Sequence, residues 1–382
     1  MWSSDCRMRI VFFWMLLLLA SPLFAQLDNN LISDKITLNT SDSNTWGLSL
    51  NNFNYLRNTE YFNDIEVGRT LFGYQLNPTL FIQPNSRMKL QAGVFVQSDF
   101  GGNPGYNKIL PTFSLKITTG KHNAGSFIFG TLEGALAHRL IEPLFDINTA
   151  ITNRIENGAQ YKIATAKHFG DVWINWEKFI ERGSPFKEQF TAGFSFQHKL
   201  FEHSNGLYIA LPYQFLAHHR GGQIDADSSN MTMQFNGAIG LQLGQVTEGW
   251  IDEWRIESYN TFYLENTNSG YFPYREGNGM YSNLFVRKGG LGMMASFWRG
   301  DKWMAPRGTN IFSSVSLHKP GYTEPIRQLI FVRFLYNKSL TDGLNLSARF
   351  EPIYDIKSSL LDFSYSLYLS YKLDQRFGKL KR

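Results

Sequence analysis

Hydrophobic and polar residues alternate strictly near the end of the chain. Between Leu361 and Leu373 the sequence reads LDFSYSLYLSYKL, with aromatic and aliphatic residues on one face and mainly serine, aspartate and lysine on the other. A period of two residues indicates a β-strand, because successive side chains point to opposite faces. A typical strand has about 5–6 residues, whereas this stretch reaches the roughly 9–11 residues that cross a membrane at a tilt.

The same pattern recurs along the chain. It is clearest at 70–82, 88–98, 189–199, 231–243 and 343–352. Short turns at 84–87, 168–171 and 288–290 alternate with longer loops at 56–69, 99–109, 133–157 and 265–278. Alternating strands joined by short turns on one side and long loops on the other are typical of an outer-membrane barrel.

The number of strands follows from parity. About 17 segments qualify, but single-chain bacterial barrels use an even number of strands. The weakest segment is the short, serine-rich 311–318, which we assign to one loop at 299–325. The sequence therefore predicts an all-β fold, a transmembrane antiparallel up-and-down β-barrel of about 16 strands, within a range of about 14–18.

The N-terminus has the layout of a secretory signal. Arg7 and Arg9 precede the apolar run 10–20, which is shorter than the about 20 residues of a spanning helix. We predict a signal peptide at 1–25, a flexible periplasmic leader at 26–44, the transmembrane barrel at 45–373 and a C-terminal tail at 374–382. The single cysteine, Cys6, lies in the signal, so the sequence predicts no disulfide or thiolate chemistry in the mature chain.

Composition narrows the functional classes. Aromatic residues make up 15% of the chain, which suits the interfacial girdles of a membrane barrel. The net charge of +5 falls only to +4 on cleavage, because Arg7, Arg9 and Asp5 leave together. This small excess does not indicate a nucleic-acid partner.

These features resemble a bacterial outer-membrane porin. The signal, the repeated amphipathic strands and the terminal strand Phe363–Leu373 carry the resemblance, and RFEPIYD at 349–355 is similar to barrels of the Bacteroidota. The resemblance implies a location in the bacterial outer membrane, with outer-membrane lipids and the barrel assembly machinery as partners. The chain departs from it by continuing past Leu373, although Phe377 offers an alternative end of the strand.

Two pairs of adjacent residues that contain histidine are candidates for chemistry. His203 and Ser204 resemble locally the His and Ser of outer-membrane lipid-modifying enzymes, but adjacent strand residues point oppositely, and Ser-Asn-Gly is an ordinary turn sequence. His218 and His219 are adjacent in an expected external loop, and a metal would need converging ligands. Neither pair supports a catalytic or metal site.

The third long loop is the predicted pore constriction. It spans 133–157, is partly apolar, and in classical porins the corresponding loop folds into the barrel. Opposed charges at a constriction create a transverse field that orients a permeating solute. The candidate constriction residues are Glu133, His138, Arg139, Glu142, Asp146, Arg154 and Glu156. The alternative is an external loop packed over the rim.

The polar strand faces give the candidate pore lining. An Arg or Lys at the lipid midplane costs about 2–4 kcal/mol, so charged residues within strands are expected to face the lumen. The candidates are Lys89, Lys116, Lys162, Arg255, Arg287, Arg333, Arg349 and Glu351. Basic residues predominate, which leaves open a mild anion preference or selection by size alone.

These observations predict a passive porin-like channel for small hydrophilic solutes, not an enzyme, with no cofactor and no metal. The alternatives are a membrane-embedded lipid-modifying enzyme using His203 and Ser204, or a non-conducting adhesin or scaffold with a filled lumen. Whether the chain forms a homo-oligomer is left open.

Overall fold

The structure is a computed structural model that describes residues 29, 31–102, 107–267 and 269–380. Its strands are β1 (Thr45–Glu60), β2 (Thr70–Asn85), β3 (Met88–Asp99), β4 (Lys108–Thr119), β5 (Gly125–Thr131), β6 (Asn157–Ala164), β7 (His168–Lys178), β8 (Glu188–Glu202), β9 (Leu207–Gly221), β10 (Thr232–Val246), β11 (Glu253–Glu265), β12 (Glu276–Lys288), β13 (Leu291–Asp301), β14 (Ile326–Thr341), β15 (Leu344–Asp355) and β16 (Leu360–Lys379). Short helices are η1 (Thr40–Asp42), η3 (Lys121–Asn123), η4 (Ala135–Ala137), α2 (Thr149–Thr152) and η5 (Asn310–Phe312).

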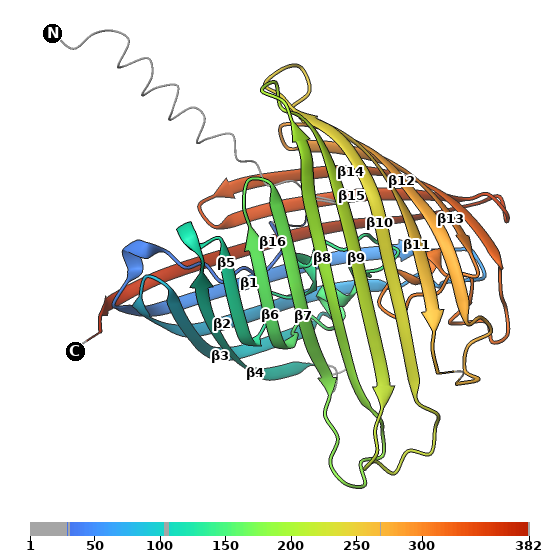
Figure 1. Cartoon of the computed structure of the whole chain (residues 1–382), viewed down its shortest axis with the longest axis horizontal. Coiled ribbons are helices and arrows are strands. Elements are labelled where there is room, and N and C mark those ends of the chain that lie inside the picture. The colour runs from blue at the N-terminus through green and yellow to red at the C-terminus, as the bar shows by residue number, and fades with distance from the viewer. Residues whose placement is uncertain (1–28, 30, 103–106, 268, 381–382) are drawn as a thin grey trace.

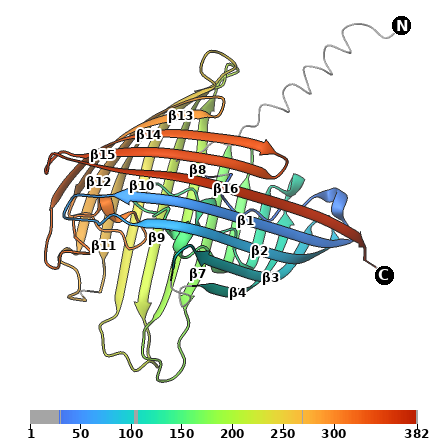
Figure 2. The same cartoon turned by 180° about the vertical axis from the view of Figure 1, so that it is seen from behind.

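Each strand pairs antiparallel with its neighbours in the chain, and β1 pairs with β16 (Figures 1 and 2). Within the described residues the result is a closed barrel of strands β1 to β16, which confirms the predicted all-β up-and-down fold. Thr45 lies opposite Lys379, so the chain enters and leaves the barrel at the same rim. We call this the terminal rim and the opposite end the loop rim.

The strand faces show why this sequence closes into a barrel. On β16, the lumen-facing Asp362 and Tyr368 are both 0% exposed, whereas the outward Leu367 is 47% exposed. On β11, Arg255 and Glu257 face inward and Ile256 faces outward with 51% exposed. Apolar side chains therefore cover the outside and polar and aromatic side chains fill the inside, the arrangement that a hydrocarbon surrounding requires.

The N-terminal segment differs from its prediction. The described part of 26–44 enters the lumen from the terminal rim, where Ile32 is 3% exposed and packs in the interior. Lumen side chains hold its backbone: Lys116 Nζ donates to the carbonyl oxygen of Ile36 at 2.8 Å, and Ser370 Oγ donates to that of Leu31 at 2.7 Å. The structure thus places a fixed luminal segment where we expected a flexible periplasmic leader. The signal peptide lies outside the described residues.

Two further boundaries are settled by pairing. Strand β16 continues through most of the predicted tail to Lys379, and Phe377 packs edge-on against Trp46 at 5.2 Å between ring centroids. The segment 311–318 forms no strand of the barrel; it contributes the end of η5 and an isolated bridge between Val315 and Thr323. No helix among the described residues is long and apolar enough to cross a membrane.

Candidate functional site

The chain leaves the barrel wall at the loop-rim end of β5 and folds into the lumen. We call residues 132–156, between β5 and β6, the inward loop. Gly130 on β5 lies opposite Gly158 on β6 at this exit. A Cβ at Gly130 would collide with the carbonyl oxygen of Phe113, and one at Gly158 with that of Ile174. Glycine at both positions lets neighbouring strands approach while the connection turns away from the wall.

The inward loop forms part of a hydrophobic core inside the barrel. Its apolar residues Leu140, Ile141 and Leu144 are at most 3% exposed. They belong to one cluster with aromatic side chains of the wall such as Tyr259 and Trp298, which are both fully buried. The predicted infolding of the third loop is thus what the structure shows, but apolar packing rather than a ring of charges fixes it.

The charged residues of the inward loop are paired. His138 lies between Asp171 and Glu156, with ring nitrogen to carboxylate distances of 3.0 and 2.9 Å, and stacks on Trp173 at 3.6 Å. Glu142 binds Arg333 across the lumen at 2.7 Å. The remaining candidates also have neighbours: Glu133 binds Lys116 and Lys162, Arg154 binds Asp34, Asp146 lies 3.9 Å from Arg69, and the Arg139 guanidinium covers the Phe169 ring. A transverse field needs opposed, separated charges; the constriction stays a prediction.

The predicted pore-lining residues all lie on the lumen side, and most are buried in ion pairs. Glu351 binds Arg57 at 2.9 Å and Arg333 at 3.4 Å, and Arg349 donates to Asn29 of the N-terminal segment at 2.6 Å. Arg255 binds Glu253 and Glu257, Arg287 binds Glu253, and Lys89 donates to the carbonyl oxygen of Thr37. Paired charges of this kind weaken the argument for anion preference.

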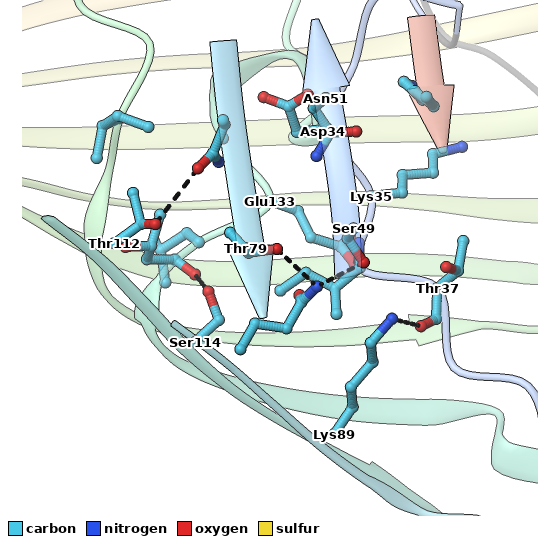
Figure 3. Close-up of a pocket in the computed structure, with 18 of the residues that line it drawn as sticks. Asp34, Lys35, Thr37, Ser49, Asn51, Thr79, Lys89, Thr112, Ser114 and Glu133 are labelled. Atoms are coloured by element: carbon cyan, nitrogen blue, oxygen red, sulfur yellow. Dashed lines mark hydrogen bonds between the residues drawn. The ribbon is translucent and has the colours of Figure 1, made fainter. Parts of the chain in front are cut away.

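Two cavities remain around the N-terminal segment. The first, of about 140 Å³, lies between that segment and strands β1 to β5 (Figure 3). Its wall is rich in hydroxyl and amide groups: Gln91 donates to Thr79 and Ser49, and Asn77 accepts from Thr112. The second, of about 380 Å³, lies at the terminal rim and is lined by Lys35, Lys116 and Lys162 among others.

A third, smaller cavity of about 40 Å³ lies in the half of the lumen nearer the loop rim. Glu177 on β7, Thr191 on β8 and Arg307 on the β13–β14 loop line it, together with residues of the inward loop. His218 on β9 lies beside Thr191, with 3.1 Å between Nδ1 and Oγ1. We call Glu177, Thr191, His218 and Arg307 the hydroxyl cluster.

The hydroxyl cluster has the groups needed for acyl transfer. The Thr191 hydroxyl donates to Glu177 Oε1 at 2.6 Å, and Arg307 Nε donates to Thr191 Oγ1 at 3.2 Å. Arg307 also forms an ion pair with Glu177. A hydroxyl within reach of an imidazole can act as a nucleophile, and an adjacent guanidinium can stabilise the oxyanion that forms.

Sequence reasoning missed this cluster because it placed His218 in an external loop. In the structure His218 lies within β9 and faces inward, whereas His219 faces outward and stacks on Phe190 at 4.8 Å. The signal was present: Glu177, Thr191 and His218 all fall on the lumen faces of consecutive strands. Only the register, which aligns Thr191 with His218, shows that they meet.

The alternative pair does not form a site. His203 and Ser204 lie exposed in the turn between β8 and β9 at the terminal rim. The carbonyl oxygen of His203 accepts from Gly206 N at 3.0 Å, which closes the turn. Among the described residues, no group of three or more His, Cys, Asp or Glu side chains is arranged to hold a metal ion.

Comparisons with known proteins identify both a family and a fold. Residues 38–380 match the sequence profile of a family described as lipid A 3′-O-deacylase-type. The fold is similar to OprD of Pseudomonas aeruginosa, with TM-score 0.52, 8% identity, and coverage of 90% of this chain and 100% of that one. It is also similar to a loop L8 deletion mutant of OmpT of Vibrio cholerae, with TM-score 0.50, 10% identity, and coverage of 86% and 100%. A comparison with curated proteins found no match.

These findings confirm one prediction from the sequence and contradict another. The closed barrel and its porin neighbours confirm the porin-like recognition and place the chain among bacterial outer-membrane β-barrels. At 8–10% identity, the neighbours show the fold and nothing of the solute. The prediction that the chain is not an enzyme is wrong, because the matching family is an enzyme family.

Proposed function

The chain belongs to the lipid A 3′-O-deacylase-type family, and we propose on that premise that it hydrolyses an ester-linked acyl chain of a lipid A-type glycolipid in the outer membrane. The family match over 38–380 carries the proposal, since it spans nearly the whole barrel. The hydroxyl cluster supplies the chemistry. It lies nearer the loop rim, where the long connections lie, and long loops face the cell exterior in outer-membrane barrels.

The proposed reaction uses each group of the cluster. In the structure the Thr191 hydroxyl donates to Glu177, so it must first turn towards His218 Nδ1, 3.1 Å away. His218 then accepts the hydroxyl proton while Thr191 Oγ1 bonds to the acyl carbonyl carbon. The ester C–O bond then breaks, and the sugar oxygen leaves with that proton. Water hydrolyses the acyl-threonine in a second step with His218 again as base. Arg307 stabilises the oxyanion of each step, and its ion pair with Glu177 fixes its position.

The test is hydrolysis by the full mature chain in bilayers that contain lipid A, followed by mass spectrometry of the glycolipid and the released fatty acid. Thr191→Ala and His218→Asn should each lower the rate about 10²–10⁴-fold, the usual contribution of a general base or its nucleophile. Thr191→Ser should retain activity. His219→Asn is the matched control, because His219 faces away from the lumen. Full activity in His218→Asn would contradict the assignment, and a wild-type chain that releases no fatty acid would contradict the function.

A second candidate function is passive diffusion of small hydrophilic solutes. The porin fold favours it, because barrels of about 16–18 strands are wide enough to enclose an aqueous channel. The 380 Å³ cavity is lined by Lys35, Lys116, Arg139 and Lys162 against Glu133, a net positive charge that would give such a path a mild anion preference even though Glu133 pairs with two of the lysines. The inward loop and the N-terminal segment fill much of the lumen, so we expect low conductance until that segment leaves.

Planar-bilayer recording separates the two candidates. The intact mature chain should conduct weakly, and deletion of residues 26–39 should raise the conductance by removing the luminal segment. Reversal potentials in a salt gradient would measure any anion preference. If a folded deletion variant still conducts nothing, the channel function is rejected while the hydrolase function is unaffected.

A further inference from the structure

We propose that the acyl chains of an outer-leaflet lipid enter the barrel sideways, through a gap in the wall between the loop-rim halves of β4 and β7, and so reach the hydroxyl cluster. This inference rests on the proposed function and specifies how a substrate that is anchored in a membrane reaches residues inside a barrel.

Two neighbouring strands of the wall are short. Strand β5 has 7 residues and β6 has 8, whereas their neighbours β4 and β7 have 12 and 11. Seven residues rise about 24 Å along the strand, or about 18 Å at a tilt of about 40°, which is less than the apolar band of about 25 Å. The wall at β5 and β6 therefore stops short of the loop rim by roughly 7 Å of hydrocarbon depth. Figure 1 shows both strands ending well before β8 and β9.

The strands on each side of this gap lack one partner over part of their length. Strand β4 pairs with β5 only from Ser114 to Thr119, so residues 108–113 have a partner on β3 alone. Strand β7 pairs with β6 only up to Asn175, so 176–178 adjoin β8 alone. An open edge at membrane depth is costly unless its backbone groups find partners. Pro111 removes one donor, and Phe113 N donates to Thr131 Oγ1 at 3.2 Å.

Exposed apolar side chains lie beside the gap. Ile109, which faces outward, is 71% exposed. Leu110 is also 39% exposed, although the alternation of β4 places it on the lumen face. On the other side Trp176 is 41% and Phe179 is 71% exposed. Apolar side chains flank the opening on both sides, as acyl chains would require. Lys178 lies at the loop-rim end of β7, where the phosphates of a lipid A-type headgroup would lie, whereas Lys108 at the end of β4 donates to the carbonyl oxygen of Thr152 in the inward loop.

The hydroxyl cluster lies behind the gap. Asn153 and Glu156, in the returning end of the inward loop, line the same cavity as Thr191 and Arg307. Asn175 and Glu177, on β7 at the level of the loop-rim end of β6, line it as well. The gap and the hydroxyl cluster are thus adjacent, because both lie at the loop-rim end of β7. This proximity to a reactive hydroxyl favours a lipid over a second copy of the chain as the occupant.

The experiment obstructs the gap and compares two substrates. The full mature chain with Leu110→Cys is labelled with a bulky maleimide in detergent and then placed in bilayers; with Cys6 replaced or removed, this is the sole thiol. The matched control is Leu241→Cys on β10, an outward residue that is 56% exposed far along the wall from the gap. Labelled Leu110→Cys should lose at least about 10-fold in hydrolysis of bilayer lipid A and keep its activity on a water-soluble short-chain ester, because only the anchored substrate needs the wall opening.

Equal loss, or no loss, in both labelled proteins would overturn the proposal. A second measurement is independent of hydrolysis: a lipid A analogue with a diazirine on its acyl chain should crosslink to peptides that contain residues 149–156 of the wild-type chain. Crosslinking only to outward residues would reject lateral entry, even if the chain proves to be a hydrolase. Crosslinks between two copies through Leu110→Cys would assign the gap to a subunit interface and also reject it. Crosslinking to 149–156 without any hydrolysis would retain the entry route and reject the reaction.

Discussion

Replacing Glu351 by Gln should unfold the barrel at markedly lower denaturant. Glu351 is the carboxylate on which luminal arginines converge: it binds Arg57 at 2.9 Å, Arg333 at 3.4 Å, and accepts from Ser364 Oγ at 3.0 Å. Its side chain is 7% exposed, and those of Arg57 and Arg333 are 5% and 1% exposed. Solvent therefore screens these charges little. The amide of Gln keeps the shape and loses the charge.

The expected magnitude follows from this geometry. A unit charge pair about 4 Å apart is worth about 4 kcal/mol at an effective dielectric constant near 20. Removal of one partner of a buried pair typically costs about 3–5 kcal/mol, because the remaining charge stays buried. Arg333 keeps Glu142 at 2.7 Å, which offsets part of its loss. Arg57 keeps its hydrogen bond to the neutral Asn148 but loses its ion pair, so we expect a loss of about 3 kcal/mol, mainly from Arg57.

Equilibrium urea unfolding in detergent, followed by tryptophan fluorescence, would measure the change. Glu181→Gln, at an exposed position in the β7–β8 loop, is the control and should change the free energy of unfolding by less than about 0.5 kcal/mol. The double variant Arg57→Met, Glu351→Gln should be more stable than Glu351→Gln alone, since it removes the uncompensated guanidinium. A loss below about 1 kcal/mol in Glu351→Gln would refute the reasoning and show that water or anions screen the luminal arginines.

Two further predictions concern the inward loop and the external loops. Gly130→Val should prevent the inward loop from leaving the wall, because the added side chain meets the Phe113 carbonyl oxygen. Heat-modifiable electrophoretic mobility should then report a poorly folded barrel. Gly183→Val is the control for replacing a glycine with positive φ, because nothing lies within 4 Å of the added Cβ. The second uses the β9–β10 loop, where a hydrogen bond from Lys187 lowers the pKa of Asp225 below its ordinary 3.8. A lowered folded pKa means that this contribution is present above the ordinary value and is lost as pH falls through the lowered one. Proteolysis of the loop with an acid-active protease should therefore begin below pH 3.8 in the wild type, and Lys187→Met should expose the loop at neutral pH as well; identical profiles would contradict the role of the ion pair.

The alternation of residues was sufficient to predict the barrel, because a period of two reports which face of a strand is buried. It placed Asp362 and Ser364 on one face and Leu367 on the other, as the structure does. It also located the third long loop. The same information could not show what lies across the lumen. Glu351 and Arg57 are 294 positions apart, and their contact depends on the closure of the whole barrel.

The N-terminal segment escaped prediction for a different reason. It has no period because no ladder of strand partners holds it. Side chains of the wall bind its carbonyl oxygens instead, Lys116 at Ile36 and Lys89 at Thr37. Every residue has a carbonyl oxygen, so these contacts do not require particular side chains in the segment. Its sequence therefore resembles a disordered leader. Ile32 and Ile36, which pack against the interior cluster, are local signs of burial in this segment.

The filled lumen changes how the polar strand faces should be interpreted. In an open pore, inward charges are solvated and their balance sets selectivity. Here aromatic side chains such as Trp298 and Phe312 pack in the interior with the inward loop, and the charges near them must pair because water is excluded. The hydroxyl cluster stands apart, since its threonine, glutamate and arginine line a cavity beside the shortened wall and its histidine lies next to the threonine. A reactive group needs a surrounding that excludes bulk water and a route by which the substrate enters. In this barrel both are found at the loop-rim end of β6, where the strand begins.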